Sequence, residues 1–207
     1  MKTTVVDHPL AQQLLTRLRD DRTDMASFRQ TTDTLARLLV YEATRSLAVE
    51  ELEVTTPLGP TRGVRIASAP LVVPVLRAGL GMLGAVLHLL PETETGFIGV
   101  ARNEETFEPE LYMNSVPADL DDRDVLVLDP MLATGGSLEH TCRILAERNA
   151  GRLTCVCILA APEGLARLEG TGLVEEVVVA SIDERLNGTA YIVPGLGDAG
   201  DRLFGTA

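Results

Sequence analysis

The segment "VLVLDPMLATGGS" at residues 125–137 combines an acid, hydroxyl groups and two adjacent glycines directly after a run of branched apolar residues. The apolar run predicts a buried strand that ends at Asp129, and a helical pattern follows the glycines. Glycine lets a chain turn so that successive backbone N–H groups point into one concavity at the start of a helix. Such a turn can hold a phosphate group, and Thr134 and Ser137 can add hydroxyl donors.

Asp129 needs a different role, because its negative charge would repel a phosphate. An acid beside a phosphate site either hydrogen-bonds sugar hydroxyls or faces a magnesium ion. The alternative for the whole segment is an ordinary strand-to-helix turn in which Ser137 caps the helix. A Walker A loop is excluded, because the chain contains no GKS or GKT triplet.

Two further glycine clusters, at residues 79–84 and 195–200, both fit the pattern G-x-G-x-x-G. Only residues 201–207 follow the second cluster, which is too short a stretch for a βαβ unit. Arg77 precedes the first cluster, and no acid-ended second strand follows it at the expected distance. We therefore expect these glycines to permit close helix packing and not to form a dinucleotide site.

The elements that must position these residues alternate along the chain. Helical periodicity or apolar segments of helical length cover residues 9–20, 24–48, 80–90, 138–148 and 162–170. Predicted strands cover residues 51–56, 62–67, 71–76, 96–101, 124–129, 153–161 and 174–180. This alternation predicts an α/β fold with a mostly parallel central sheet flanked by helices. Ligands of such sheets bind beyond the carboxyl ends of the strands.

Composition limits the classes of protein to which the chain can belong. With 207 residues and 45% hydrophobic content the chain can bury a core, and residues 1–207 are expected to form a single domain. The sequence contains neither about 18 consecutive apolar residues nor a signal peptide, which predicts a cytoplasmic protein without a membrane partner. The net charge of −12 argues against nucleic acid as a partner. The three cysteines are too few and wrongly spaced for a zinc site, and we predict no metal site made by side chains alone.

Five motifs resemble those of the uracil phosphoribosyltransferase family, in that family's order and spacing. They are "VLRAGLGM" (75–82), "RNEETFEP" (102–109), "VLDPMLATGGS" (127–137), "AAPEG" (160–164) and "YIVPGLGDAGDRLFGT" (191–206). The long C-terminal motif and the Asp-Pro form of the glycine loop are the specific parts, because many other phosphoribosyltransferases carry two adjacent acids there. The chain departs from the family at Ala101, where Tyr is common, and in residues 111–120, which lack a frequent Lys.

The resemblance implies a type I phosphoribosyltransferase-like fold with N-terminal helices and a C-terminal base-binding segment. It also implies a reaction, the transfer of the phosphoribosyl group of 5-phospho-α-D-ribose 1-diphosphate (PRPP) to N1 of uracil. The products are UMP and diphosphate, so the reaction belongs to pyrimidine salvage. Magnesium is expected to arrive bound to PRPP.

The resemblance also implies roles for individual residues. Arg77, Arg102 and Asp198 match catalytic positions that contact PRPP, and a forked guanidinium suits a diphosphate leaving group. The remaining implied PRPP contacts are Asp129, Pro130, Met131, Leu132, Ala133, Thr134, Gly135, Gly136 and Ser137. The implied uracil contacts are Ile192, Gly197, Asp198 and Ala199, where backbone groups can match the donors and acceptors of the base. For Asp198 the alternative is a side chain that stabilises a turn.

Other classes of function remain as alternatives. A nucleotide-sensing, RNA-binding regulatory relative is the main one, and the negative charge weighs against it. The C-terminal motif argues against an enzyme of the same fold that acts on a purine or on orotate. The family resemblance leaves activation by GTP open. We expect a homodimer or a multiple of it, because the amphipathic N-terminal helices offer more apolar surface than one small sheet needs.

Overall fold

A mostly parallel sheet of eight strands forms the centre of the molecule in the computed structural model, which describes residues 1–102 and 109–205. The strand order is β1-β10-β9-β7-β4-β5-β6, and the short β8 also pairs with β9. Neighbouring strands run parallel except for β6, which is antiparallel to β5. The strands are β1 Lys2–Val5, β4 Leu71–Leu76, β5 Ile98–Arg102, β6 Pro109–Asn114, β7 Val125–Leu128, β8 Met131–Leu132, β9 Leu153–Ala160 and β10 Glu176–Ile182.

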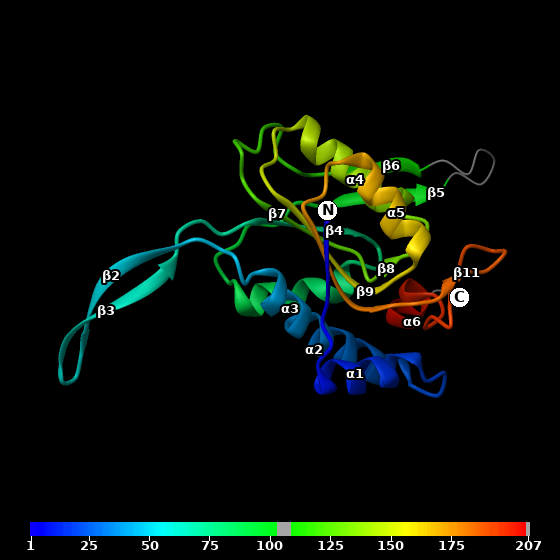
Figure 1. The fold of residues 1–207 in the computed structure, drawn as a ribbon, viewed down its shortest axis with the longest axis horizontal. Coiled ribbons are helices and arrows are strands. Elements are labelled where there is room, and N and C mark those ends of the chain that lie inside the picture. Colours follow the sequence, from blue (N-terminus) through cyan, green and yellow to red (C-terminus); the bar gives the residue numbers. More distant parts are fainter. Residues whose placement is uncertain (103–108, 206–207) are drawn as a thin grey trace.

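Helices cover both faces of the sheet (Figure 1). They are α1 Pro9–Arg19, α2 Met25–Ala43, α3 Leu80–Leu89, α4 Gly136–Glu147, α5 Pro162–Thr171 and α6 Ala199–Phe204. On β7, Leu126 and Leu128 pack with α1, α2 and α3, whereas Val125 and Val127 pack with α4 and α5. Because successive strand residues face opposite helical layers, both must be apolar, and this produces the continuous apolar runs in the sequence. The predicted α/β fold is confirmed.

The order of strands reverses between β4 and β7. From β4 the chain passes through α3 to β5 on one side, and from β7 it passes through α4 to β9 on the other side. The two crossover helices belong to different apolar layers, since Met82 of α3 and Leu138 of α4 lie in separate clusters. Such a reversal opens a crevice at the carboxyl ends of the two strands. Arg77 and Asp129 follow these two strand ends.

The N-terminal helices bury most of their apolar residues, while Leu10 of α1 and Met25 and Tyr41 of α2 stay exposed. Leu18 of α1 and Phe28, Leu35 and Leu39 of α2 are all fully buried against the sheet. The helix predicted over residues 24–48 ends at Ala43, because the chain has to leave the sheet and enter β2.

Further exposed apolar side chains lie on a hairpin. Its strands, β2 Val49–Thr56 and β3 Gly59–Ile66, project away from the sheet and its helices (Figure 1). The exposed apolar residues of this hairpin are Val49, Val54, Leu58, Val64 and Ile66. An isolated two-stranded hairpin is only marginally stable in water, so this arrangement favours a partner surface.

Candidate active site

The turn from β7 to α4 has the geometry of an anion-binding loop. Gly135 adopts a left-handed conformation with φ of 78° and precedes the first residue of α4. Among the described residues no side chain caps this helix, and Ser137 lies inside its first turn, so the alternative of a Ser137 cap does not hold. The N–H of Gly136 has only a long hydrogen bond, 3.5 Å, to Oγ1 of Thr134. The backbone N–H groups of the first turn are therefore available to an anion.

Helix α5 supports this loop from behind. A Cβ atom on Gly164 would lie 2.4 Å from the carbonyl oxygen of Ala133, which is closer than any real contact. A Cβ atom on Gly135 would in turn lie 3.0 Å from the carbonyl oxygen of Gly164. Sequence reasoning assigned Gly164 no role, although its motif "AAPEG" was part of the family resemblance. Gly164 fixes how closely the loop backbone and α5 approach.

Asp129 lies at the start of the loop and keeps some contact with solvent. Burial raises the pKa of Asp129 to about 7, and the N–H of Met131, which donates to its Oδ1 at 3.2 Å, only partly opposes this shift. No cationic side chain of the described residues contributes to the shift. A desolvated carboxyl group of this kind would gain from a bound cation or from hydroxyl donors.

Arg77 lies directly after β4, and the peptide bond between Leu76 and Arg77 is cis. Its Nη2 is 4.0 Å from Oδ1 of Asp201 in α6, and 59% of its side chain is exposed. A Cβ atom on Gly79 would lie 2.4 Å from the carbonyl oxygen of Leu128, so the turn that carries Arg77 packs against the end of β7. Arg77 therefore lies between the glycine loop and the C-terminal segment.

The glycines of residues 79–84 serve packing, as the sequence predicted. Besides the contact of Gly79 with β7, a Cβ atom on Gly81 would lie 2.6 Å from the side chain of Leu203 in α6. These glycines bring α3 close to two neighbours.

The C-terminal segment presents backbone groups at this edge of the sheet. Ile192 belongs to β12 Ile192–Val193, which pairs antiparallel with β11 Arg185–Leu186. The side chains of Ile192 and Ala199 are buried, whereas Gly197, with φ of 81°, is exposed.

Asp198 caps helix α6. Its Oδ1 accepts a hydrogen bond from the N–H of Asp201 at 2.9 Å. The alternative role of a turn-stabilising side chain is thus present in the structure. Asp198 is nevertheless exposed, as is the neighbouring Gly197.

Arg102 is the last residue of β5. Its backbone pairs with Pro109, but its side chain and residues 103–108, which include most of the predicted flap, lie outside the described residues. Because β5 runs parallel to β4, the carboxyl end of β5 lies at the same edge of the sheet as Arg77.

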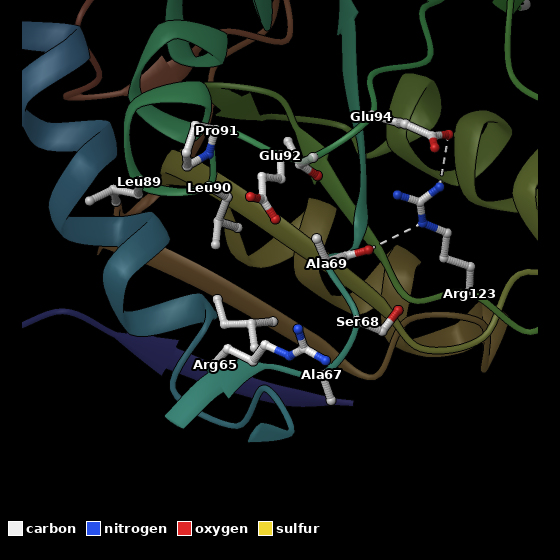
Figure 2. A pocket seen from close by; sticks show the side chains of 12 residues that line it. Arg65, Ala67, Ser68, Ala69, Leu89, Leu90, Pro91, Glu92, Glu94 and Arg123 are labelled. Atoms are coloured by element: carbon white, nitrogen blue, oxygen red, sulfur yellow. Dashed lines mark hydrogen bonds and ion pairs between the residues drawn. The ribbon is translucent and has the colours of Figure 1, made fainter. Parts of the chain in front are cut away.

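A pocket in the described part of the chain lies at the other end of β4. It has a volume of about 720 Å³ and opens between the base of the hairpin and the end of α3 (Figure 2). Its Arg123 already donates to the carbonyl oxygen of Ala69 at 3.2 Å and to Oε2 of Glu94 at 2.9 Å. Since none of the predicted site residues lines this pocket, we do not assign it to the candidate active site.

The described residues contain no group of three or more His, Cys, Asp and Glu side chains arranged to hold a metal ion. Within the same residues, no helix combines the length and the apolar character needed to cross a membrane.

A glycine turn after one central strand, an arginine after its neighbour and a C-terminal segment beside that arginine are the arrangement expected of the phosphoribosyltransferase class. Solved structures bear this out for the fold. An adenine phosphoribosyltransferase from Leishmania donovani matches with a TM-score of 0.58 and 15% identity, covering 91% of this chain and 86% of that one.

The particular family follows from closer relatives. The model of the uracil phosphoribosyltransferase family matches residues 5–206, and the chain belongs to this family. It is 55% identical over 209 residues to the uracil phosphoribosyltransferase of Leifsonia xyli subsp. xyli, covering 100% of both chains. It is 54% identical over 210 residues to that of a Nocardioides species, covering 99% of both. A protein of solved structure from Aquifex aeolicus is 40% identical, with a TM-score of 0.92 and 99% coverage of both chains.

Proposed function

We propose that this chain is a uracil phosphoribosyltransferase, which transfers the phosphoribosyl group of PRPP to N1 of uracil and releases diphosphate. One observation carries the proposal beyond family membership. Support comes from two proximities at the ends of β4 and β7: the turn that carries Arg77 packs at Gly79 against Leu128, and Arg77 lies 4.0 Å from Asp201 of the C-terminal segment.

The reaction exchanges one bond at the anomeric carbon for another. The bond from C1 of the ribose to the diphosphate oxygen breaks, and its electron pair leaves with the diphosphate. The bond from C1 to N1 of uracil forms, and N1 loses its proton. Positive charge builds on the ribose and negative charge on the leaving group, so cations aimed at the diphosphate stabilise the transition state. Arg77 and Arg102 are assigned this role, and residues 129–137 hold the 5-phosphate and the ribose.

Uracil is recognised by the backbone at Ile192, Gly197 and Ala199. The base presents an imide N–H between two carbonyls, and cytosine would place donors against donors and leave buried groups unpaired. Asp198 lies beside these backbone groups and is assigned to contact PRPP and to assist the loss of the N1 proton.

Magnesium fits the loop through Asp129. A desolvated carboxyl group whose pKa is raised to about 7 is a group that a cation would stabilise in its charged form. When bound with PRPP, the ion would neutralise charge on the diphosphate. Asp129 would face either this ion or the ribose hydroxyls.

We also propose that residues 1–207 act as one domain and assemble as a homodimer or a multiple of it. The support for assembly comes from the exposed apolar residues of the β2–β3 hairpin. Activation by GTP is tested by adding GTP to the assay below.

The test is release of diphosphate from PRPP with magnesium present, comparing uracil, cytosine, hypoxanthine and orotate, and identifying the nucleotide formed. We expect UMP from uracil and no nucleotide from the other bases. Binding of PRPP or nucleotides without any turnover would instead favour a nucleotide-sensing relative, and turnover with hypoxanthine or orotate would reassign the base.

A further inference from the structure

A buried ion pair holds the base-binding segment from outside the family motifs. Asp183 follows the last residue of β10 and is 7% exposed. Arg19, the last residue of α1, donates to both of its carboxylate oxygens, with Nη1 at 2.7 Å from Oδ2 and Nη2 at 2.5 Å from Oδ1. Ser181 adds a third donor, its Oγ at 3.2 Å from Oδ1. Asp183 is therefore a fully engaged carboxylate.

The same pair fixes both backbone groups of Gly195. Its N–H donates to Oδ2 of Asp183 at 2.9 Å, and its carbonyl oxygen accepts from Nη1 of Arg19 at 2.8 Å. Gly195 has φ of 65°, and a Cβ atom there would lie 2.1 Å from the carbonyl oxygen of Ile192. With both of its polar groups held, the two peptide planes that meet at Gly195 cannot rotate freely.

Gly195 lies between the positions assigned to uracil. Ile192 precedes it and Gly197 follows it, so the orientation of its peptide planes is transmitted to both. A second arginine, Arg202 of α6, holds the next residue, because its Nη1 donates to the carbonyl oxygen of Leu196 at 2.8 Å and its Nη2 to that of Asp20 at 2.7 Å. Arg19 of α1 and Arg202 of α6 thus hold the segment at two successive residues, Gly195 and Leu196.

The pair is electrostatically satisfied. Burial alone would raise the pKa of Asp183, but the hydrogen bonds from Arg19 and Gly195 outweigh it and lower the pKa below its usual range. Removing one member would leave a buried charge uncompensated, which is strongly destabilising.

We propose that Asp183 and Arg19 are positioning residues for base recognition, which orient the backbone of residues 192–197 toward uracil through Gly195. This inference rests on the proposed function, since it assigns a role within the uracil site. Neither residue is expected to touch the substrates. The effect on the reaction should appear in the use of uracil and not in the use of PRPP.

The first variant is Asp183→Asn, which preserves size and shape. An asparagine has one oxygen and one NH₂ group, so it cannot accept from both arms of Arg19 and from Gly195. We expect the KM for uracil to rise by about tenfold or more, because misaligned backbone groups lose about one hydrogen bond to the base. The KM for PRPP should change by less than about threefold, and the preference for uracil over cytosine in kcat/KM should fall.

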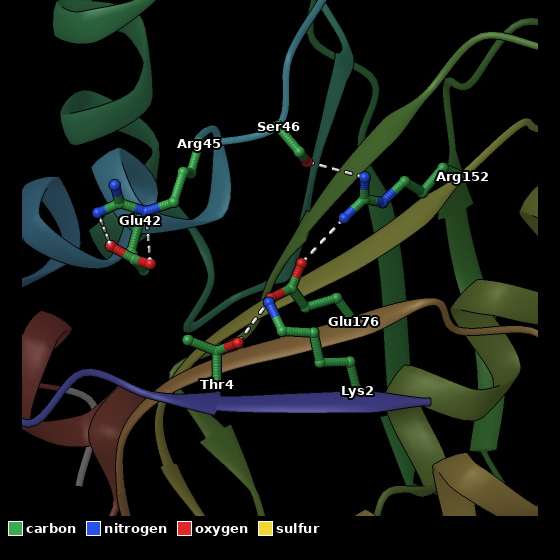
Figure 3. Close-up of polar contacts among 7 residues, drawn as sticks. All are labelled: Lys2, Thr4, Glu42, Arg45, Ser46, Arg152 and Glu176. Carbon is green, nitrogen blue, oxygen red and sulfur yellow. Dashed lines mark hydrogen bonds and ion pairs between the residues drawn. The ribbon is translucent and has the colours of Figure 1, made fainter.

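The matched control is Glu176→Gln at the opposite end of the same strand. Glu176, the first residue of β10, is 6% exposed and accepts from Lys2 at 2.7 Å, Thr4 at 2.6 Å and Arg152 at 2.9 Å (Figure 3). Its pKa is also below the usual range, because the hydrogen bonds from Lys2 and Thr4 outweigh the effect of burial. Glu176→Gln should lower the thermal midpoint like Asp183→Asn, yet leave the KM for uracil unchanged.

If Asp183→Asn fails to fold, Arg19→Lys replaces it, because lysine keeps the charge and loses the fork. A raised KM for uracil with either folded variant, absent from Glu176→Gln, supports the proposal. Destabilisation without a change in the KM for uracil, or an equal change in both KM values, would overturn it. Turnover of uracil by the unmodified chain is measured first. If the unmodified chain does not turn over uracil, the proposed function is wrong. If it does and only the expected change in the variants is missing, this inference alone is wrong.

Discussion

At the scale of single residues, the raised pKa of Asp129 predicts a dependence of stability on pH. A carboxyl group whose pKa is about 7 in the folded chain and near 3.8 when exposed favours the folded state while it is protonated. That contribution is complete below the exposed pKa and is lost as pH rises through 7. Without ligands, the free energy of unfolding should therefore fall by about 2 to 3 kcal/mol between pH 5 and pH 8, and the thermal midpoint should fall with it.

The comparison is made with Asp129→Asn, which cannot ionise and should lose much less stability over the same interval. Asp7→Asn, at an exposed carboxyl group, serves as the control and should follow the unmodified chain. An identical pH dependence in the unmodified chain and in Asp129→Asn would contradict the prediction.

The two arginines should differ in their effect on turnover. Arg77→Ala should raise the KM for PRPP and lower kcat, because its turn is fixed by packing against β7 and its guanidinium is preorganised. If Arg102 closes on the departing diphosphate, Arg102→Ala should lower kcat at least as much as kcat/KM. Each loss should amount to about 2 to 4 kcal/mol, or two to three decades in rate. Steady-state kinetics test this assignment. If Arg102→Ala changes the KM for PRPP and leaves kcat intact, Arg102 does not stabilise the departing diphosphate.

The backbone conformation of Gly197 determines which substitution best tests its assignment to uracil binding. At its φ of 81° any other residue is strained. A bulky replacement would therefore lower activity both through backbone strain and through blockage of the base site, and the two effects could not be separated. Gly197→Ala should nearly abolish turnover of uracil, whereas Gly172→Ala should only destabilise the chain by about 1 kcal/mol. Gly172 is the control because it has φ of 67° and open space around it. Equal turnover in the two variants would refute the uracil assignment.

At the scale of elements, the close approach of α5 to the glycine loop is predicted to control the proposed binding of phosphate. Gly164→Ala places a methyl group 2.4 Å from the carbonyl oxygen of Ala133, so the loop must move. We expect the KM for PRPP to rise by at least about tenfold, since small displacements of a binding group have large effects. The KM for uracil should change little.

Gly170 of the same helix provides the control for this prediction. A Cβ atom on Gly170 would meet nothing within 4 Å, so Gly170→Ala should leave kinetics unchanged and raise stability by about 0.5 to 1 kcal/mol. If the KM for PRPP is the same in Gly164→Ala as in Gly170→Ala, the loop does not bind the phosphate and is only a structural turn.

Short polar elements were the ones that the sequence did not predict. β1 reads "KTTV" and forms one edge of the sheet beside β10, and α6 has only 6 residues. An edge strand needs one paired side only, so it requires no apolar run that a sequence would reveal. The central strands were predicted because burial on both faces demands uninterrupted apolar residues.

At the scale of the whole molecule, the projecting hairpin is predicted to mediate self-association. Val49 pairs with Ile66 and Glu51 with Val64, so Val49, Val64 and Ile66 share one face of the hairpin. The pair of changes Val49→Lys and Val64→Lys should shift the chain from dimer to monomer in sedimentation velocity, because two charges would be buried at the contact.

Thr61→Lys is the control, since Thr61 pairs with Val54 on the other face. It should leave the dimer intact. A monomeric unmodified chain would contradict the proposed assembly, and dissociation by Thr61→Lys alone would move the contact to the other face.

The sequence by itself determined the family, the mostly parallel sheet and the three segments of the candidate site. These are local properties: apolar runs, glycines at a turn and motif spacing each act over a few residues. The tertiary structure decided which distant groups support them. Arg19 and Asp183 lie 164 positions apart, and α4 and β9 separate Gly164 along the chain from the loop that it contacts. No sequence periodicity links such residues. Only the packing of α1 and α5 against the sheet brings the charge of Arg19 and the backbone contact of Gly164 to the candidate site.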